Sequence, residues 1–427
     1  MVTFEALTEE YWICRKGKRT SYDMSTLEME WIKKLLRLRD GINSRTWKPG
    51  QSSCFILTFP VPREVVAAEN VDRVVHQYID SRLRPLLEGM VFHHRAFSCI
   101  KGRGTLYGIK TLAEDIRMES ATVCLLEDPM NPEADCSRPI GIMPYTRDCW
   151  VLHLDIKSCF MSIPRASVHQ QVDRFIVEHY HREDKEDLRY VCRECILNNP
   201  GENCRLISPE SMWRKVPPGK SFRTAEPGKG LGIGNLFVQL FFCMYVSGID
   251  DKFDLHLIPR HGRYTDDWYA VSHDKSRLLS FVPIFRQGLK DLGLRMNERK
   301  FWLQHYSKGL QFTGAVVKPG RTYISRRTLG GLADSVERLN TIAKETDPDN
   351  PDEEALDAME RAVSSINAYT GMSVHHAAKR RRSKILSALT PEALRFASIH
   401  KDYEGVRIRK QYRKRTRILA MIESGEW

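Results

Sequence analysis

The sequence has no long hydrophobic run and little material for a disulfide framework. Its apolar runs stay below the roughly 20 residues that cross a bilayer, and the N-terminus lacks a basic segment followed by an apolar one. We therefore expect a cytoplasmic protein with no membrane partner. The 11 cysteines are an odd number and lie mostly singly, which favours reduced thiols.

One group of cysteines leaves a metal site open. Cys192 and Cys195 form a Cys-x-x-Cys pair, with Cys204 downstream and His179 and His181 upstream. Zinc takes four such ligands in tetrahedral geometry, and this set can supply them. No second Cys-x-x-Cys pair follows, however, and the histidines lie in a charged segment that we expect to be helical. Cysteines that only pack in the interior are the favoured interpretation.

The overall composition is that of a globular protein with a polyanionic partner. Hydrophobic residues make up 42% of the chain and charged residues 28%, so a disordered or membrane-embedded chain is excluded. A length of 427 residues can bury a large core. The net charge of +12 and the pI near 9.1 favour binding to nucleic acid.

Two adjacent aspartates, Asp266 and Asp267, lie between Tyr264 and Trp268. Successive side chains of a strand point to opposite faces, so these carboxylates come together only in a tight hairpin turn. Their mutual repulsion is relieved by cations, and a pair of divalent ions suits this task. The alternative is an ordinary solvated turn.

Two further segments favour the metal site. Residues 150–157 read as a buried strand with Asp155 near its end. Residues 230–235 are a glycine-rich loop that opens an apolar stretch, residues 236–246, long enough for a buried helix. Each segment is a weak signal alone, and their order along the chain is more informative.

This order of strand, glycine loop and Asp-Asp turn resembles the palm of reverse transcriptases, where the turn has the pattern Tyr-x-Asp-Asp. Other segments resemble further parts of the family. Residues 62–66 and 72–77 resemble its basic finger segment, and residues 95–105 resemble a small glycine-rich element. The lysine block, the primer-gripping hairpin and a thumb helix are matched by residues 294–300, by residues 307–314, and by residues 365–369 with His375 and His376. The resemblance covers roughly residues 55–390.

The resemblance implies an α+β, right-hand polymerase fold with fingers, a helical thumb, and a palm whose antiparallel sheet carries the catalytic aspartates. The expected parts are an N-terminal helical extension (1–55), interleaved fingers and palm (56–325), a helical thumb (326–390) and a basic C-terminal extension (391–427). Within the first part, the apolar spacing over residues 27–38 predicts one amphipathic helix.

The implied chemistry is nucleotidyl transfer with two Mg²⁺ ions, for which Mn²⁺ is a possible substitute. Asp155 and Asp266 are the expected bridging ligands, Asp267 supports them, and the backbone carbonyl of Ile156 completes a coordination shell. Lys300 is expected to protonate or neutralise the leaving pyrophosphate, unless it is an ordinary solvated lysine.

The resemblance also implies residues that bind the incoming nucleotide. Arg63 would clamp the triphosphate with its planar fork. Phe160 would exclude a ribose 2′-hydroxyl, although an aromatic residue in an apolar run is more commonly part of the core. Ile233 replaces a glutamine that many relatives carry before Gly234, and Gln239 ends the loop. Ile233 resembles diversity-generating retroelement and defence enzymes.

Basic residues cluster late in the chain, with aromatic residues between them. The residues expected to bind RNA are Arg380, Arg381, Arg382, Arg413, Lys414 and Arg415. Such a surface can bind phosphates and stack on bases. The alternative interpretation is a helix face that is simply exposed to solvent.

Together these features predict an RNA-directed DNA polymerase that makes cDNA from a dedicated structured non-coding RNA and deoxynucleotide triphosphates. Retroelement enzymes usually carry serine where this chain has Val238, so a role in bacterial antiviral defence is favoured. The alternatives are an error-prone retroelement enzyme and a catalytically inactive RNA-binding scaffold. An accessory protein partner is left open.

Overall fold

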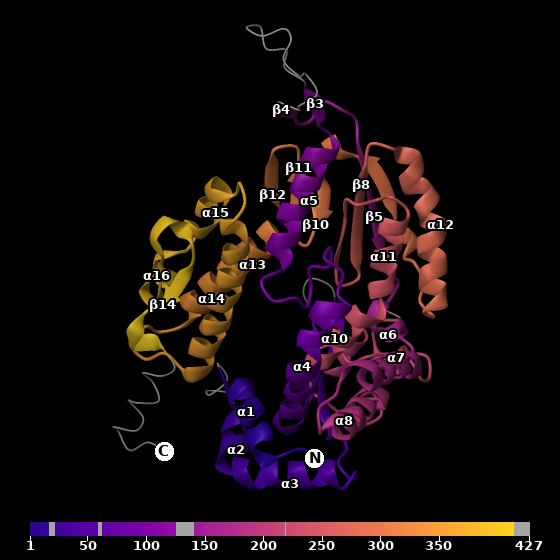
Figure 1. Ribbon diagram of the computed structural model, residues 1–427. Coiled ribbons are helices and arrows are strands. Elements are labelled where there is room, and N and C mark those ends of the chain that lie inside the picture. The colour runs from indigo at the N-terminus through magenta and orange to yellow at the C-terminus, as the bar shows by residue number, and fades with distance from the viewer. Residues whose placement is uncertain (17–21, 59–61, 125–140, 218, 414–427) are drawn as a thin grey trace. The chain divides into compact units, whose positions relative to one another are not determined.

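The computed structural model describes residues 1–16, 22–58, 62–124, 141–217 and 219–413. The chain divides into two compact units, each built from two stretches of sequence. The elements of each unit can be found in Figure 1 by their labels. The first unit comprises Met1–Gly108 and Trp150–Leu303, and the second comprises Ile109–Cys149 and Gln304–Trp427. Within the described ranges, none of the helices combines the length and apolarity that a bilayer crossing requires.

The first unit is a mixture of helices and two small sheets. Its helices are α1 (Phe4–Arg15), α2 (Tyr22–Met29), α3 (Trp31–Asn43), α4 (Asn70–Met90), α6 (Cys159–Ser162), α7 (Arg165–His179), α8 (Lys185–Leu197), α9 (Glu210–Trp213), α10 (Leu236–Tyr245), α11 (Ser247–Leu255) and α12 (Lys275–Asp291). Its strands are β1 (Ser52–Leu57), β2 (Arg63–Ala67), β5 (Trp150–Asp155), β6 (Cys204–Leu206), β7 (His261–Tyr264), β8 (Asp267–Ser272) and β9 (Trp302–His305), which ends just beyond the unit.

The four-stranded sheet of this unit has the order β7-β8-β5-β9. Strand β8 is antiparallel to both β5 and β7, and Asp267 lies opposite Asp155 on one side and opposite Tyr264 on the other. The expected antiparallel sheet with its aspartates at one end is therefore present. The other sheet, β2-β1-β6, pairs β1 antiparallel with β2 and parallel with β6.

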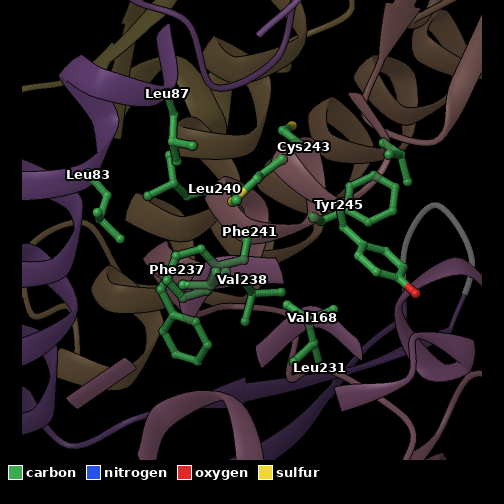
Figure 2. Packing of buried hydrophobic residues seen from close by; sticks show 14 of the residues in the cluster. Leu83, Leu87, Val168, Leu231, Phe237, Val238, Leu240, Phe241, Cys243 and Tyr245 are labelled. Carbon is green, nitrogen blue, oxygen red and sulfur yellow. The ribbon is translucent and has the colours of Figure 1, made fainter. Parts of the chain in front are cut away.

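Helix α10 forms the centre of the core. All its residues are buried except Leu236 and Gln239, as expected for a helix that is apolar on every side. Figure 2 shows Phe237, Leu240 and Phe241 of α10 among Leu83, Leu87 and Val168, which come from α4 and α7. The predicted helix over residues 236–246 is confirmed to within one residue.

The N-terminal segment is helical, as expected, but the predicted single helix over residues 27–38 is wrong. Helix α2 ends at Met29 and α3 begins at Trp31, because Glu30 leaves the helical conformation with φ −132° and ψ 23°. The two helices still place Leu27, Leu35 and Leu38 in the same buried cluster. The apolar spacing therefore predicted which side chains are buried but not where the helix is interrupted.

The second unit contains helices α5 (Thr105–Glu119, which begins in the first unit), α13 (Arg326–Glu345), α14 (Glu353–Val374), α15 (Lys379–Leu386) and α16 (Pro391–Phe396). Its strands are β3 (Thr122–Cys124), β4 (Gly141–Met143), β10 (Leu310–Phe312), β11 (Ala315–Lys318), β12 (Arg321–Ile324), β13 (Ala397–Ile399) and β14 (Val406–Ile408). They form the sheets β10-β11-β12, β13-β14 and β3-β4.

The C-terminal segment does not separate from the helices before it. Phe396, Ala397, Val406 and Ile408 share one buried cluster with residues of α13 and α14. The boundary expected after residue 390 therefore does not coincide with an edge of this core. Apolar residues of the β13-β14 hairpin supply part of the cover that α13 and α14 need.

Candidate active site

The Asp-Asp pair lies at a two-residue hairpin turn, Thr265-Asp266, between β7 and β8. Thr265 has the left-handed φ of 57°, and its backbone N–H donates to Ser98 Oγ at 3.0 Å. Its carbonyl accepts from the Arg263 guanidinium at 3.4 Å. The turn is thus held from both sides, and it places Asp266 beside Asp267 and close to Asp155 at the end of β5.

The Asp155 carboxylate is buried and fully engaged. Its Oδ1 accepts from Lys300 Nζ and its Oδ2 from Asn297 Nδ2, both at 2.7 Å. The Asp155 carbonyl also accepts from the Asn297 N–H at 2.8 Å. Burial raises the pKa of the Asp155 carboxyl, although Lys300 and Asn297 act in the opposite direction. Lys300 itself has a raised pKa, because the three aspartates outweigh its own desolvation, so it stays protonated.

Asp267 is paired with His153, which sequence reasoning did not identify. His153 Nε2 lies 3.5 Å from Asp267 Oδ1, and its Nδ1 donates to the Lys300 carbonyl at 2.9 Å. The ring stacks on Trp302 with centroids 4.7 Å apart. Burial alone would raise the pKa of Asp267, but His153 and Lys300 outweigh it and the pKa is lowered. His153 precedes Asp155 by two residues, so strand alternation was the signal that could have found it.

The ionised form of the Asp266 carboxyl is destabilised by its surroundings. Burial, followed by the negative charges of Asp267 and Asp155, raises the pKa of its carboxyl to about 7. A divalent cation would remove this penalty, and hard carboxylate oxygens are the ligands that Mg²⁺ prefers. Ile156 follows Asp155 directly and pairs with Met296, which places its backbone at the same strand end. The donor set therefore fits the expected magnesium site.

The glycine-rich loop packs against β2. The Ile233 carbonyl accepts from the Val66 N–H at 2.7 Å. Gly234 has φ +119°, and a Cβ at this position would lie 2.6 Å from the Val66 carbonyl oxygen. Only glycine fits there, because both the backbone conformation and the close approach exclude a side chain. Arg63 is exposed at the start of the same strand, three residues before Val66.

Phe160 lies in α6, next to the glycine-rich loop in the fold. Its carbonyl accepts from the Leu231 N–H at 2.8 Å, and its half-buried ring packs against Phe242 of α10 with centroids 5.2 Å apart. Gln239 is exposed on α10, with its Oε1 4.0 Å from Cys99 Sγ. The structure thus places Phe160 between the glycine-rich loop and α10.

The residues expected to bind RNA divide into three groups. Arg380, Arg381 and Arg413 are exposed. Arg382 was a wrong choice, because it is only 3% exposed and donates to the Tyr403 carbonyl at 2.7 Å and to Ser373 Oγ at 3.4 Å. Arg382 therefore holds the fold of this unit together. Lys414 and Arg415 lie outside the described residues.

The cysteine cluster does not form a metal site in the described part of the chain. Cys192 and Cys195 are buried on α8, where desolvation raises the pKa of both thiols, and Cys204 neighbours Cys54 across β1 and β6. His179 ends α7, and His181 follows it in a loop. The favoured interpretation as packing cysteines agrees with this burial. Among the described residues, the group placed to hold a metal through histidine and carboxylate consists of His93, His94 and Asp254.

The family model described as reverse transcriptase (RNA-dependent DNA polymerase) matches residues 62–317 of the chain. This chain belongs to the reverse transcriptase family. The printed description of that family names an RNA-dependent DNA polymerase. Reverse transcriptases generally use divalent metal ions.

Two solved telomerase chains are similar to this reverse transcriptase at low identity. Telomerase from Candida albicans, in complex with a TWJ fragment of telomeric RNA, is 11% identical with a TM-score of 0.42; the match covers 81% of this chain and 58% of that one. Apo telomerase from Candida tropicalis, truncated from the C-terminal domain, is 12% identical with a TM-score of 0.40, and the match covers 65% and 55%. This chain thus spans less than two thirds of either telomerase. No curated protein sequence matches it.

Proposed function

We propose that this reverse transcriptase makes cDNA from a dedicated structured non-coding RNA by two-metal nucleotidyl transfer. The observation that carries the proposal is the convergence of Asp155, Asp266 and Asp267 at one end of the sheet, with Lys300 bound to Asp155 at 2.7 Å. A cluster of like charges is costly to keep beside a polyanionic substrate unless cations bind there. This favours an active polymerase over an inactive RNA-binding scaffold.

Each side chain has a distinct part in the proposed reaction. Two Mg²⁺ ions, held by Asp155, Asp266 and the Ile156 carbonyl with support from Asp267, would stabilise the attacking and leaving oxygens together. His153 orients Asp267, and Asn297 orients Asp155. Lys300 keeps its proton next to Asp155 and would donate it to, or neutralise, the leaving pyrophosphate.

The substrate contacts follow from the surroundings of the aspartates. Phe160 would lie beneath the sugar, Ile233 and Gly234 would contact the nucleotide, Gln239 would lie at the end of this site, and Arg63 would bind the triphosphate. In the second unit, α13 to α15 would act as the thumb, and the exposed Arg380, Arg381 and Arg413 would bind the RNA.

For the biological role we propose bacterial antiviral defence. Ile233 resembles some defence enzymes, and Val238 departs from the serine that retroelement enzymes usually carry. An error-prone enzyme of a diversity-generating retroelement is the second candidate, because Ile233 also resembles that group. Sequencing the nucleic acid that copurifies with the protein distinguishes them. A single fixed cDNA supports the first role, and a product in which template positions are heavily substituted supports the second.

The catalytic proposal is tested with the double substitution Asp266→Asn and Asp267→Asn. DNA synthesis should be abolished, while RNA binding stays nearly intact, because the carboxylates hold metal and other surfaces hold phosphate. Asp251→Asn is the matched control, since Asp251 is an exposed aspartate of α11. Primer extension by the double variant at the wild-type rate with Mg²⁺ would show that the active site has been assigned wrongly.

A further inference from the structure

His93, His94 and Asp254 form a cluster away from the Asp-Asp turn. His93 and His94 follow α4, Asp254 lies near the end of α11, and one ligand atom from each lies within 4.8 Å of the others. His93 Nε2 is 2.9 Å from Asp254 Oδ2, and the two imidazole rings have centroids 4.2 Å apart. Two imidazoles and a carboxylate thus converge in a cluster that contains none of Asp155, Asp266 and Asp267.

A third histidine packs against this cluster. His261, at the start of β7, is fully buried, and its ring centroid lies 5.1 Å from that of His93. Its Nδ1 donates to the Ile258 carbonyl at 2.9 Å, and among the described residues its Nε2 has no hydrogen-bond partner. Three imidazole rings are therefore gathered at this place in the fold.

We propose that His93, His94 and Asp254 bind one Zn²⁺ ion, with water in the fourth position. Imidazole nitrogens with one carboxylate suit zinc, whereas Mg²⁺ prefers ligand sets made of oxygen alone. The Asp254 side chain is 42% exposed, so water can reach the open position. His94 is also exposed, which gives the ion a route to the site.

Coordination has a defined consequence for the proton of His93. The Arg95 N–H donates to His93 Nδ1 at 3.1 Å, so the ring proton is on Nε2 and points to Asp254. Zinc would replace that proton at Nε2, and the ring would then carry its proton on Nδ1. The hydrogen bond from the Arg95 N–H to His93 Nδ1 would then be lost, and His93 and Asp254 would each form a bond to the metal.

The position of the cluster suggests what the ion would do. The segment that begins with His93 runs beside β7: the Arg95 carbonyl accepts from the Arg263 N–H at 3.0 Å, and the Phe97 N–H donates to the Arg263 carbonyl at 2.9 Å. The same segment ends at Ser98, which accepts from the Thr265 N–H at the catalytic turn. Zinc would fasten the first end of this segment to α11 and so steady the support of the turn.

The test is calorimetric titration of Zn²⁺ into the full chain, purified with a chelator and then kept in excess Mg²⁺ so that the palm aspartates are occupied. We expect one Zn²⁺ per chain, and at least about tenfold weaker binding in His94→Ala, because loss of even an outer contact to a metal ligand typically costs 10- to 100-fold. Co²⁺ in place of Zn²⁺ should give visible absorption bands that His94→Ala loses. These readouts do not depend on polymerase activity.

Two further variants keep the result decisive. His375→Ala removes an exposed histidine of the second unit and should bind Zn²⁺ like the wild type. Cys192→Ser with Cys195→Ser should also bind normally; loss of zinc in this variant would place the ion at the cysteines and overturn the proposal. The proposal also fails if the wild type does not bind Zn²⁺, or if His94→Ala and Asp254→Asn bind it unchanged.

Discussion

Lys300 Nζ and Asp155 Oδ1 lie 2.7 Å apart, so a flexible cation from the segment before β9 rests on the buried carboxylate at the end of β5. The contact brings together a group that can donate a proton and a group that can bind metal. It also explains how Asp155 tolerates burial next to Asp267. Lys300 neutralises the cluster in part, and its raised pKa keeps it protonated.

Replacing Lys300 by Met should slow nucleotide addition by about 10²- to 10⁴-fold, the usual range for a general acid, with a smaller effect on nucleotide binding. Single-turnover incorporation in Mg²⁺ measures this rate. Lys290→Met is the control, because Lys290 is exposed at the end of α12. An unchanged rate in Lys300→Met would show that Lys300 takes no part in the reaction and is only a structural or solvated lysine.

Replacing Phe160 by Ala should raise the incorporation of ribonucleotides relative to deoxynucleotides, because the ring would no longer exclude the 2′-hydroxyl. Each 1.4 kcal/mol of lost exclusion corresponds to about a tenfold change in preference. Phe160→Tyr keeps the ring and should keep the preference. If the alanine variant is folded and active yet discriminates like the wild type, Phe160 only packs against Phe242.

Replacing Arg380 and Arg381 by Gln should weaken RNA binding and flatten its salt dependence, by up to about one slope unit for each lost phosphate contact. Adding Arg413→Gln should extend the effect. Extension of a generic, pre-annealed primer and template should stay largely unchanged, because the chemistry belongs to the palm. If RNA binding and generic primer extension are reduced equally, these residues lie in the general template path. If neither is reduced, they form only a solvent-exposed face.

Arg382→Gln should behave differently from its exposed neighbours. The buried guanidinium donates to the Tyr403 carbonyl and to Ser373, and their loss leaves buried acceptors unsatisfied. We expect about 1–3 kcal/mol lower unfolding free energy in urea. Arg381→Gln is the matched control and should change stability by less than about 0.5 kcal/mol. Equal stability of the two variants would contradict the structural role of Arg382.

Replacing Arg263 by Met should destabilise the protein by about 3–5 kcal/mol, because it leaves Asp250 buried without its partner. Arg263 Nε and Nη2 contact the Asp250 carboxylate at 2.7–3.0 Å, and both side chains are fully buried. Arg286→Ala breaks an exposed pair with Glu298 and should cost at most about 1 kcal/mol. Urea unfolding of both variants measures the difference, and similar losses would argue against the buried pair.

Much of the palm follows from local sequence patterns. A short, mostly apolar run over residues 150–157 predicts β5 as a buried strand. Continuous apolarity over residues 236–246 predicts α10, and two consecutive aspartates between aromatic residues predict the hairpin turn. These patterns suffice because strand burial, full helix burial and turn geometry can be read from neighbouring residues. The interruption at Glu30 was missed because the spacing of apolar residues continues across it.

The sequence by itself therefore determined the family, the central strands and the central helix, and it singled out Asp155, Asp266 and Asp267 as candidates. Tertiary structure alone decided how these groups are partnered. His153 and Asn297 reach Asp267 and Asp155 because β5 packs beside β8 and the segment before β9. The pKa of Asp266 rises because it is buried and three carboxylates become close neighbours.

Arg382 and Arg381 are adjacent and identical in the sequence, and only the packing of α15 against Tyr403 buries one and exposes the other. Burial and charge proximity depend on the whole fold, and no local pattern contains them.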